Sequence, residues 1–312
     1  MRKPITHARQ APGLVREGTR PAPRALIGLP ALIVLLSCLD STVATEAPEL
    51  DPTPLLDRLG RVAWLYADTA LRFSCRETIT VDRGSPHRYD YIYTHDKDGR
   101  FRDYRTRPGR SSGKEVNLGN EGLRRWVSQA YSWVFIFRAD RRERFRFAAS
   151  AGGDVLGRPA VRLDFEPIPP YKENVNDWAG TAFIDRDTSQ ILKVEGWSRA
   201  DFLERSGFDN ALEALRTAPH GFGPPAGIES PRYFTFETTV TEFGAEKNGM
   251  RFPSEVRIEL RRYRVPGAGG RDFDSVPVYQ VRQAYTGYRF FSVRTAGEIK
   301  AMFSGSAAAP PP

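Results

Sequence analysis

One stretch near the middle of the chain, residues 160–199, constrains the fold more than any other feature. Val161, Leu163 and Phe165 alternate with charged residues, and this period of two places the apolar side chains on one face of a half-buried strand. Two further apolar runs, residues 180–184 and 191–197, flank the polar segment DRDTSQ, whose Asp and Ser side chains favour a turn. We therefore predict an antiparallel hairpin near the middle of a larger sheet.

The same alternation recurs on both sides of this hairpin. Tyr89, Tyr91 and Tyr93 share one strand face, and Asn248-Gly249 is a strong signal for a tight hairpin turn. Helical spacing occurs over residues 54–73 and 120–137, and over residues 201–216 with a break near Gly207. The pattern predicts an α+β fold, in which a large curved antiparallel sheet of about eleven strands forms an open half-barrel with helices covering its concave face. The expected strands are residues 75–81, 88–95, 101–106, 144–147, 161–165, 180–184, 191–197, 233–243, 252–263, 276–285 and 288–294.

The first 45 residues have the composition of an export signal. Six Lys and Arg residues precede an apolar run over residues 25–39 that Asp40 ends, as in a secretory signal with a charged and then an apolar region. The run is shorter than the roughly 20 residues of a membrane span, and the alternatives are a mis-assigned start or a short anchor. Residues 1–37 carry +5 of the net charge of +8, so the mature chain is only weakly basic.

Cys38 lies in the sequence LLSC, which resembles the site at which bacterial lipoproteins are cleaved and acylated. Ordinary cleavage after Thr42-Val43-Ala44, a small-x-small site, is the alternative. In both cases Cys75 has no internal partner, so we expect no structural disulfide and a buried Cys75. The predicted location is the periplasm, or the bacterial envelope with membrane association through an acylated Cys38.

Residues with obvious catalytic or metal-binding patterns are scarce. His87 and His95 lie on one predicted strand but about 26 Å apart, too far to share a metal ion. Ser111 and Ser112 have no G-x-S-x-G context. The acidic residues mostly alternate with arginines on strand faces, as in solvated cross-strand ion pairs, and the weakly basic mature chain argues against nucleic acid as a partner. We predict no catalytic residue, no metal and no cofactor.

The positive signal is the supply of aromatic and branched side chains on one face of many strands. A large antiparallel sheet must cover such a face by closing, by packing a second layer or by folding around a ligand. The few helices favour a concave groove that takes acyl chains, and the alternative is a core filled by side chains. The candidate ligand-binding residues are Tyr91, Trp126, Ala130, Trp133, Phe165, Ile184, Val194, Phe236 and Ile258.

Residues 120–137 are expected to form a helix over the mouth of this groove. Trp126, Ala130 and Trp133 are spaced at i, i+4 and i+7, so they form one stripe that would face Tyr91, Phe165 and Ile184. The end of the segment, YSWVFIF, is apolar on nearly all sides. Such a helix is either a movable lid or a packed core helix.

The order of these elements resembles the LolA/LolB lipoprotein-localisation superfamily, and in particular outer-membrane lipoprotein-sorting-like proteins. The similarity is carried by GTAFID at residues 180–185, by the pattern TxxILKVEG at residues 188–196 and by MRFPS at residues 250–254. It covers residues 54–295. The resemblance implies an open barrel with helices over its mouth, acyl chains of lipoproteins as ligands, and no cofactor. The insertion over residues 199–231 and the loop over residues 265–275 depart from the family pattern.

These observations lead to one main functional hypothesis and two alternatives. The main hypothesis is an exported, non-catalytic carrier or sensor that binds a lipidic ligand, such as the acyl chains of a lipid or lipoprotein, with a possible envelope protein as partner. The alternatives are a periplasmic hydrolase that uses clustered carboxylates and an envelope scaffold without a ligand. The predicted organisation is a signal over residues 1–45, a single LolA-like domain over residues 46–303 and a disordered tail over residues 304–312.

Overall fold

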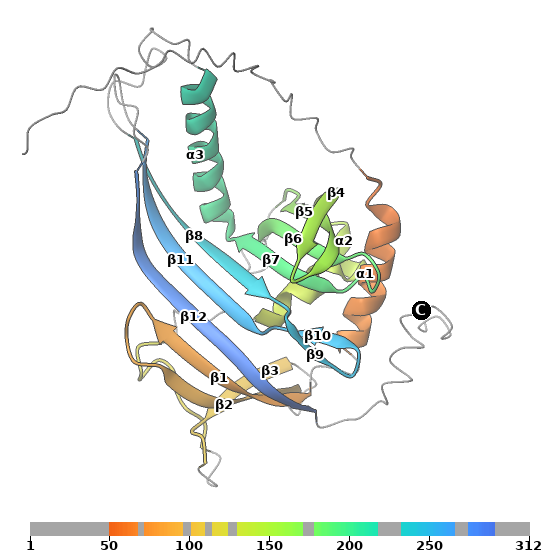
Figure 1. Ribbon diagram of the computed structural model, residues 1–312, viewed down its shortest axis with the longest axis vertical. Coiled ribbons are helices and arrows are strands. Elements are labelled where there is room, and N and C mark those ends of the chain that lie inside the picture. Colours follow the sequence, from red (N-terminus) through yellow and green to blue (C-terminus); the bar gives the residue numbers. More distant parts are fainter. Residues whose placement is uncertain are drawn as a thin grey trace, which may run out of the picture. The chain divides into compact units, whose positions relative to one another are not determined.

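An antiparallel sheet of ten strands organises the protein (Figure 1). The computed structural model describes residues 50–67, 72–95, 101–109, 114–123, 130–170, 178–217, 232–265 and 274–290. These residues belong to a unit that runs from Glu46 to Pro312, and Met1–Thr45 forms a separate unit. The predicted signal with Cys38, and the predicted tail over residues 304–312, lie outside the described residues.

The strands follow the order β3-β2-β1-β12-β11-β8-β7-β6-β5-β4, and a separate two-stranded sheet pairs β10 with β9. All ladders are antiparallel, and the sheet is open, with β3 and β4 as its edges. The predicted large open antiparallel sheet is therefore confirmed. The strands are β1 Phe73–Val81, β2 His87–His95, β3 Phe101–Thr106, β4 Phe145–Val155, β5 Arg158–Pro167, β6 Ala179–Asp185, β7 Ile191–Trp197, β8 Arg232–Glu242, β9 Ala245–Lys247, β10 Met250–Phe252, β11 Glu255–Val265 and β12 Asp274–Phe290.

The first and last strands of the chain lie side by side. β1 pairs with β12 along its whole length, from Phe73 opposite Phe290 to Val81 opposite Val281. The chain must then cross from the edge strand β3 to the opposite edge strand β4. This crossover contains the 3₁₀ helix η3 (Ala130–Phe137) and the short helix α2 (Ala139–Arg142).

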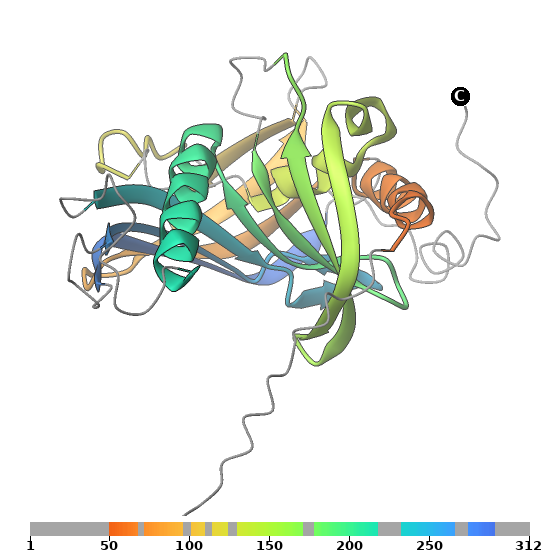
Figure 2. The same ribbon diagram turned by 90° about the horizontal axis from the view of Figure 1, so that it is seen from above.

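The two faces of the sheet have different helical covers. The face that we call inner carries Phe165, Val194 and Tyr285, which pack in one large core with η3 and with α1 (Thr53–Leu65). The outer face over β7, β8 and β11 carries a smaller core, built with Phe208 of α3 (Arg199–Thr217). Seen from above, α1 and α3 lie on either side of β4 to β7 (Figure 2).

The hairpin predicted from residues 180–197 is present as β6 and β7. The Asp185 carboxylate accepts hydrogen bonds from the backbone N–H groups of Asp187 and Thr188, at 2.9 and 3.1 Å, so the polar segment forms the expected Asx-type turn. The hairpin lies nearer the β4 edge than the centre, because β1, β2 and β3 add to the far side of β12.

The structure corrects two predicted helices. Residues 120–123 form turns instead of a helix, residues 124–129 lie outside the described part, and only Ala130–Phe137 is helical, as a 3₁₀ helix. Aromatic and β-branched residues have low α-helix propensity, so tertiary packing decides the conformation of this segment. In contrast, α3 runs unbroken through Gly207, which lies against the ring of Phe234.

Two predicted boundaries were also wrong. α1 ends at Leu65, and Phe73 begins β1. The two predicted C-terminal strands are one strand, β12, with a register shift opposite Ser74 and Arg76. Asn248 and Gly249 do form the predicted tight turn, with positive φ at both, but this turn joins the small strands β9 and β10, and β11 pairs with β8.

Candidate functional site

The inner face has a notch where β6 and β7 pair. Gly180 and Gly196 are direct cross-strand partners, so neither strand presents a side chain at this point. A Cβ atom on Gly196 would lie 2.1 Å from the indole of Trp133, and one on Gly180 would lie 2.7 Å from the ring of Phe165. These two rings therefore fill a space that only the glycine pair leaves open.

Trp133 is held in this glycine notch by polar and aromatic contacts. Its indole Nε1 donates a hydrogen bond to Thr241 Oγ1 at 2.9 Å. Its ring lies 6.4 Å from that of Phe165 and stands almost perpendicular to that of Trp178, at 5.2 Å between centroids. Trp133 is only 4% exposed, so it closes the notch completely.

Most of the predicted ligand-binding residues are brought together, but they fill the inner face with side chains. Trp133 contacts Phe165 as the sequence predicts, and both belong to one buried core. Trp126 lies outside the described residues. The members of this inner core are Tyr91, Ala130, Trp133, Phe165, Ile184, Val194 and Ile258, each at most 6% exposed.

Phe236 was wrongly assigned to the inner face. The register of β8 with β11 is unbroken, so side chains along β8 alternate strictly between the two faces. Thr241 contacts Trp133 on the inner face, which places Phe236 on the outer face. There it stacks on Tyr263 at 4.6 Å and packs against Phe208 of α3. The alternation within β8 was visible in the sequence, but its phase relative to the other strands was not.

The inner face also holds a buried ion pair that the sequence analysis missed. Glu77 is fully buried and accepts two hydrogen bonds from the guanidinium of Arg105, at 2.5 and 2.9 Å. Burial works against the charged guanidinium, but the hydrogen bonds and charge of Glu77 outweigh it and raise the pKa of Arg105 above its usual value. The available signal was Glu77 itself, which shares a strand face with the buried residues Cys75 and Ile79.

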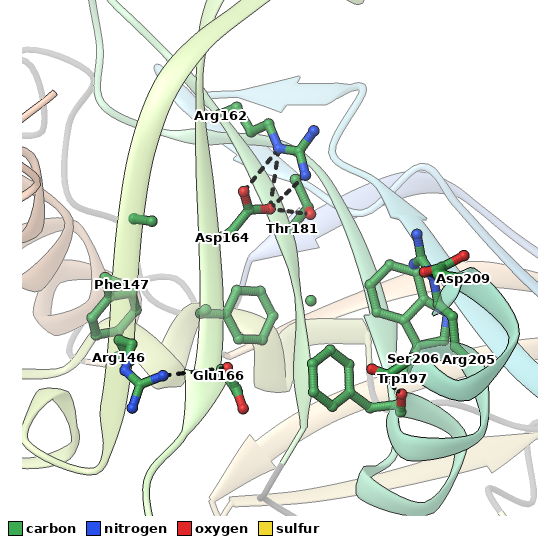
Figure 3. Close-up of a pocket in the computed structure, with 14 residues that line it drawn as sticks. Arg146, Phe147, Arg162, Asp164, Glu166, Thr181, Trp197, Arg205, Ser206 and Asp209 are labelled. Atoms are coloured by element: carbon green, nitrogen blue, oxygen red, sulfur yellow. Dashed lines mark hydrogen bonds and ion pairs between the residues drawn. The ribbon is translucent and has the colours of Figure 1, made fainter. Parts of the chain in front are cut away.

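An open groove lies on the other face of the sheet, between α3 and strands β4 to β6 (Figure 3). Its volume is about 240 Å³. The sheet contributes charged side chains that point outward, and α3 contributes a second wall beside Trp197 of β7. The lining that bears on function consists of Arg146, Asp164, Glu166, Trp197, Phe202, Arg205 and Asp209.

The charges of this outer groove are paired, but not equally. Asp164 is fully engaged, because Arg162 donates to both of its oxygens at 3.0 to 3.1 Å and the Thr181 hydroxyl donates to one of them. Glu166 lies 3.9 Å from Arg146. Asp209 lies 3.5 Å from Arg205, whose guanidinium covers the Trp197 ring at 3.8 Å. The last two ion pairs are therefore loose and retain hydrogen-bonding capacity.

The described residues contain no cluster of three or more His, Cys, Asp or Glu side chains that could hold a metal ion. Cys75 is buried, as predicted. In the ranges that the structure describes, no helix is both long and apolar enough to cross a membrane.

Comparisons with known proteins give weak structural likenesses only. No family model and no curated protein matches the chain. A DUF1329 family protein from Desulfovibrio piger is 13% identical with a TM-score of 0.40, over 82% of this chain and 99% of that one. The structure of MucB in complex with MucA(peri) is 14% identical with a TM-score of 0.22, over 78% of this chain and 100% of the other. The Pseudomonas aeruginosa MucA/MucB complex is 15% identical with a TM-score of 0.25, over 77% and 100%.

At these identities and TM-scores the comparisons assign neither a family nor a function to the chain. The class that the structure itself defines is an open antiparallel sheet with few helices. The resemblance to the LolA/LolB superfamily stays a prediction.

Proposed function

We propose that the chain is an exported, non-catalytic binding protein that takes an acyl chain of a lipid or lipoprotein into the glycine notch on its inner face. The observation that carries this proposal is the position of Trp133. Together with the ring of Phe165, its indole fills a side-chain-free space in the apolar core of the inner face, and it belongs to the short 3₁₀ helix η3 rather than to the sheet.

Displacement of Trp133 would create a binding site from residues that are already in place. The space that it leaves is bounded by Phe165, Gly196 and Thr241, and Val194 is the cross-strand partner of Thr241. An acyl chain that replaces the indole buries apolar surface at about 25 cal/mol per Å². The cost of opening is the lost packing of Trp133 and its one hydrogen bond, so the unliganded protein stays closed.

The proposal includes a place in the cell and a class of partner. The segment before Thr45 directs the chain to the periplasm or anchors it to the envelope through Cys38, and an envelope protein is the expected donor or acceptor of the lipid. The proposed function needs no cofactor, since a carrier only binds and releases its ligand.

One observation favours the hydrolase as the second candidate function. Three carboxylates, of Asp164, Glu166 and Asp209, line the outer groove. Each lies within 4 Å of an arginine, so the three form the ion pairs of a solvated strand or helix face rather than a pair of carboxylates that converge on one reacting group. The carrier therefore has the better geometric support.

Substitution of Thr241 by Val tests the carrier. The change removes the acceptor for Trp133 Nε1 and keeps the shape of the side chain, so it destabilises the closed state by about 1–3 kcal/mol. The free-energy cost of opening falls by the same amount, so the affinity for a fluorescent fatty acid such as cis-parinaric acid should rise by about fivefold to about 150-fold. Binding is measured by saturable fluorescence and by displacement with palmitate.

Strand β8 offers a matched control. Thr238 accepts a hydrogen bond from Trp197 Nε1 at 3.0 Å on the outer face, so Thr238→Val removes an equivalent bond away from the notch. This variant should lose similar stability and leave probe affinity unchanged. The carrier proposal fails if the folded wild type binds no acyl probe, or if the two variants change its affinity equally.

A further inference from the structure

The outer groove is open and lined in part by charged side chains, whereas the inner notch is filled and apolar. We infer that the outer groove binds a neutral, polyhydroxylated ligand, namely a short segment of oligosaccharide. The inference does not rest on the acyl-chain proposal, because the charged side chains of the groove lie on the face of the sheet opposite Trp133, although Phe165 and Gly180 line both sites.

The overall charge of the groove excludes strongly charged ligands. Three arginines and three carboxylates line it, and each carboxylate lies within 4 Å of one of the arginines. A purely anionic or purely cationic ligand gains little from such a surface, because each attractive side chain stands beside a repulsive one. A fatty acyl chain is excluded as well, since it would strip water from several charged groups without replacing their hydrogen bonds.

The loose ion pairs favour hydroxyl groups. Glu166 and Arg146 are 3.9 Å apart, and Asp209 and Arg205 are 3.5 Å apart, which is beyond a good hydrogen bond in both cases. Within the described residues Glu166 has no closer partner than Arg146. A hydroxyl group both donates and accepts, so adjacent hydroxyls of a sugar can donate to the carboxylate and accept from the guanidinium of the same pair.

The walls of the groove supply the apolar component that a sugar ring needs. Phe202 is partly buried and packs against the small core that contains Trp197, and the guanidinium of Arg205 covers the face of Trp197 itself. The two loose pairs come from opposite walls, Glu166 and Arg146 from the sheet and Asp209 and Arg205 from α3 (Figure 3). A pyranose ring between these walls can present its C–H face to Phe202 and its hydroxyls to both ion pairs.

The test is titration of the full chain with neutral oligosaccharides, maltotriose, cellotriose and chitotriose, by calorimetry and by saturation-transfer NMR. At least one should bind saturably to the wild type. Glu166→Ala and Arg146→Ala alter exposed side chains, so the protein stays folded, and each should weaken binding about tenfold through the loss of charge-assisted hydrogen bonds. Arg282→Ala is the matched control, because it breaks an exposed ion pair with Glu255 on β12 and β11, and it should leave binding unchanged.

Four results would overturn the inference. The first is a folded wild type that binds none of the oligosaccharides. The second is equal weakening by Arg282→Ala and the two groove variants. The third is a groove that binds a mixed-charge Lys/Glu peptide in preference to every oligosaccharide. New reducing ends during the titration would also overturn it, in favour of a hydrolase whose carboxylates cleave the ligand.

Discussion

Two threonines of strand β8 accept hydrogen bonds from tryptophans, one on each face of the sheet. The elements that cover the two faces at these points differ in kind. On the inner face Thr241 accepts from Trp133 of the eight-residue η3, whose indole fills the glycine notch. On the outer face Thr238 accepts from Trp197, which belongs to the sheet and packs beneath the 19-residue helix α3. The inner bond fastens a separate element to the sheet, whereas the outer bond joins two neighbouring strands.

The two faces differ in what must move to expose the tryptophan. Both tryptophans are about equally buried, at 4% and 5% exposure. Removal of the inner indole requires a shift of one short helix, while α3 is held by a continuous stack of Phe208, Tyr263 and Phe236. Five of the described side chains of η3 are buried, those of Ala130, Trp133, Val134, Ile136 and Phe137, so its opening needs an apolar ligand that replaces the lost packing.

We expect the largest effect when a charge is placed in the inner core, compared with a charge on the outer helix α3. Ile184→Asp introduces an unpaired charge into the inner core, where the side chain is fully buried, and should cost more than about 5 kcal/mol and abolish cooperative unfolding. Leu203→Asp on α3 is the control, since Leu203 is 59% exposed, and it should melt like the wild type. Retained melting of Ile184→Asp at an unchanged temperature would place β6 elsewhere.

A second prediction compares ion pairs on the two faces. Glu77→Gln removes the buried counter-charge of Arg105 and leaves only the partly exposed Asp103, at 3.0 Å, as an ionised partner, so it should lower the free energy of unfolding by about 3–5 kcal/mol. Glu255→Gln on β11 loosens ion pairs with Arg257 and Arg282, which are largely exposed, and should cost less than about 1 kcal/mol. Urea denaturation of both variants measures the difference, and equal costs would contradict the burial of Glu77.

A third prediction compares the addition of one methyl group on the inner face with the same addition in α3. Gly196→Ala forces the Cβ against Trp133 and should cost about 1–3 kcal/mol while it weakens the hold of η3. Gly207→Ala meets the Phe234 ring at an ordinary 3.4 Å and should stabilise α3 by up to about 1 kcal/mol. Thermal melting distinguishes the two, and a stabilising Gly196→Ala would show that the notch is not filled.

The smallest effect concerns pH and the turn that joins β6 to β7. Burial raises the pKa of Asp185, but the hydrogen bonds from Arg158 and from two backbone N–H groups lower it further, so the net shift is below the usual 3.8. Stability from this carboxylate is therefore present above pH 3.8 and lost as the pH falls through the lowered value. Asp185→Asn should cost about 1 kcal/mol at pH 7 and much less in strong acid. Asp187→Asn, at an exposed position, is the control for melting across the same pH range.

The sequence predicted the local part of the fold well. The hairpin of β6 and β7, the three tyrosines of β2 on one face and the Asn248-Gly249 turn all follow from side-chain periodicity and turn chemistry within a few residues. The pairing of β1 with β12 and the crossover between the edges could not be predicted in this way. β1 and β12 are far apart in the sequence, and no local pattern indicates that they pair. Because this pairing adds β1, β2 and β3 beyond β12, the hairpin lies away from the centre of the sheet.

The candidate sites were predicted less completely. The contact of Trp133 with Phe165 was foreseen, but the plugged notch depends on the pairing of Gly180 with Gly196, which needs the register of two strands. The outer groove depends on α3 lying beside β5, and its ion pairs were seen in the sequence only as charges on a strand face. Phe236 was misplaced for a similar reason. Periodicity shows that side chains alternate along a strand, but it does not show which set of side chains faces the inner core.

The placement of β1 beside β12 also decides when the sheet can form. Gln280 and Asp82 exchange hydrogen bonds although they are 198 positions apart in the chain. Pairings of such separation are slow, since the loop between them must lose its freedom before the contacts form. During synthesis β1, β2 and β3 are made first and must wait for the last strand to appear. A chain with this connectivity stays incompletely folded until β12 is available.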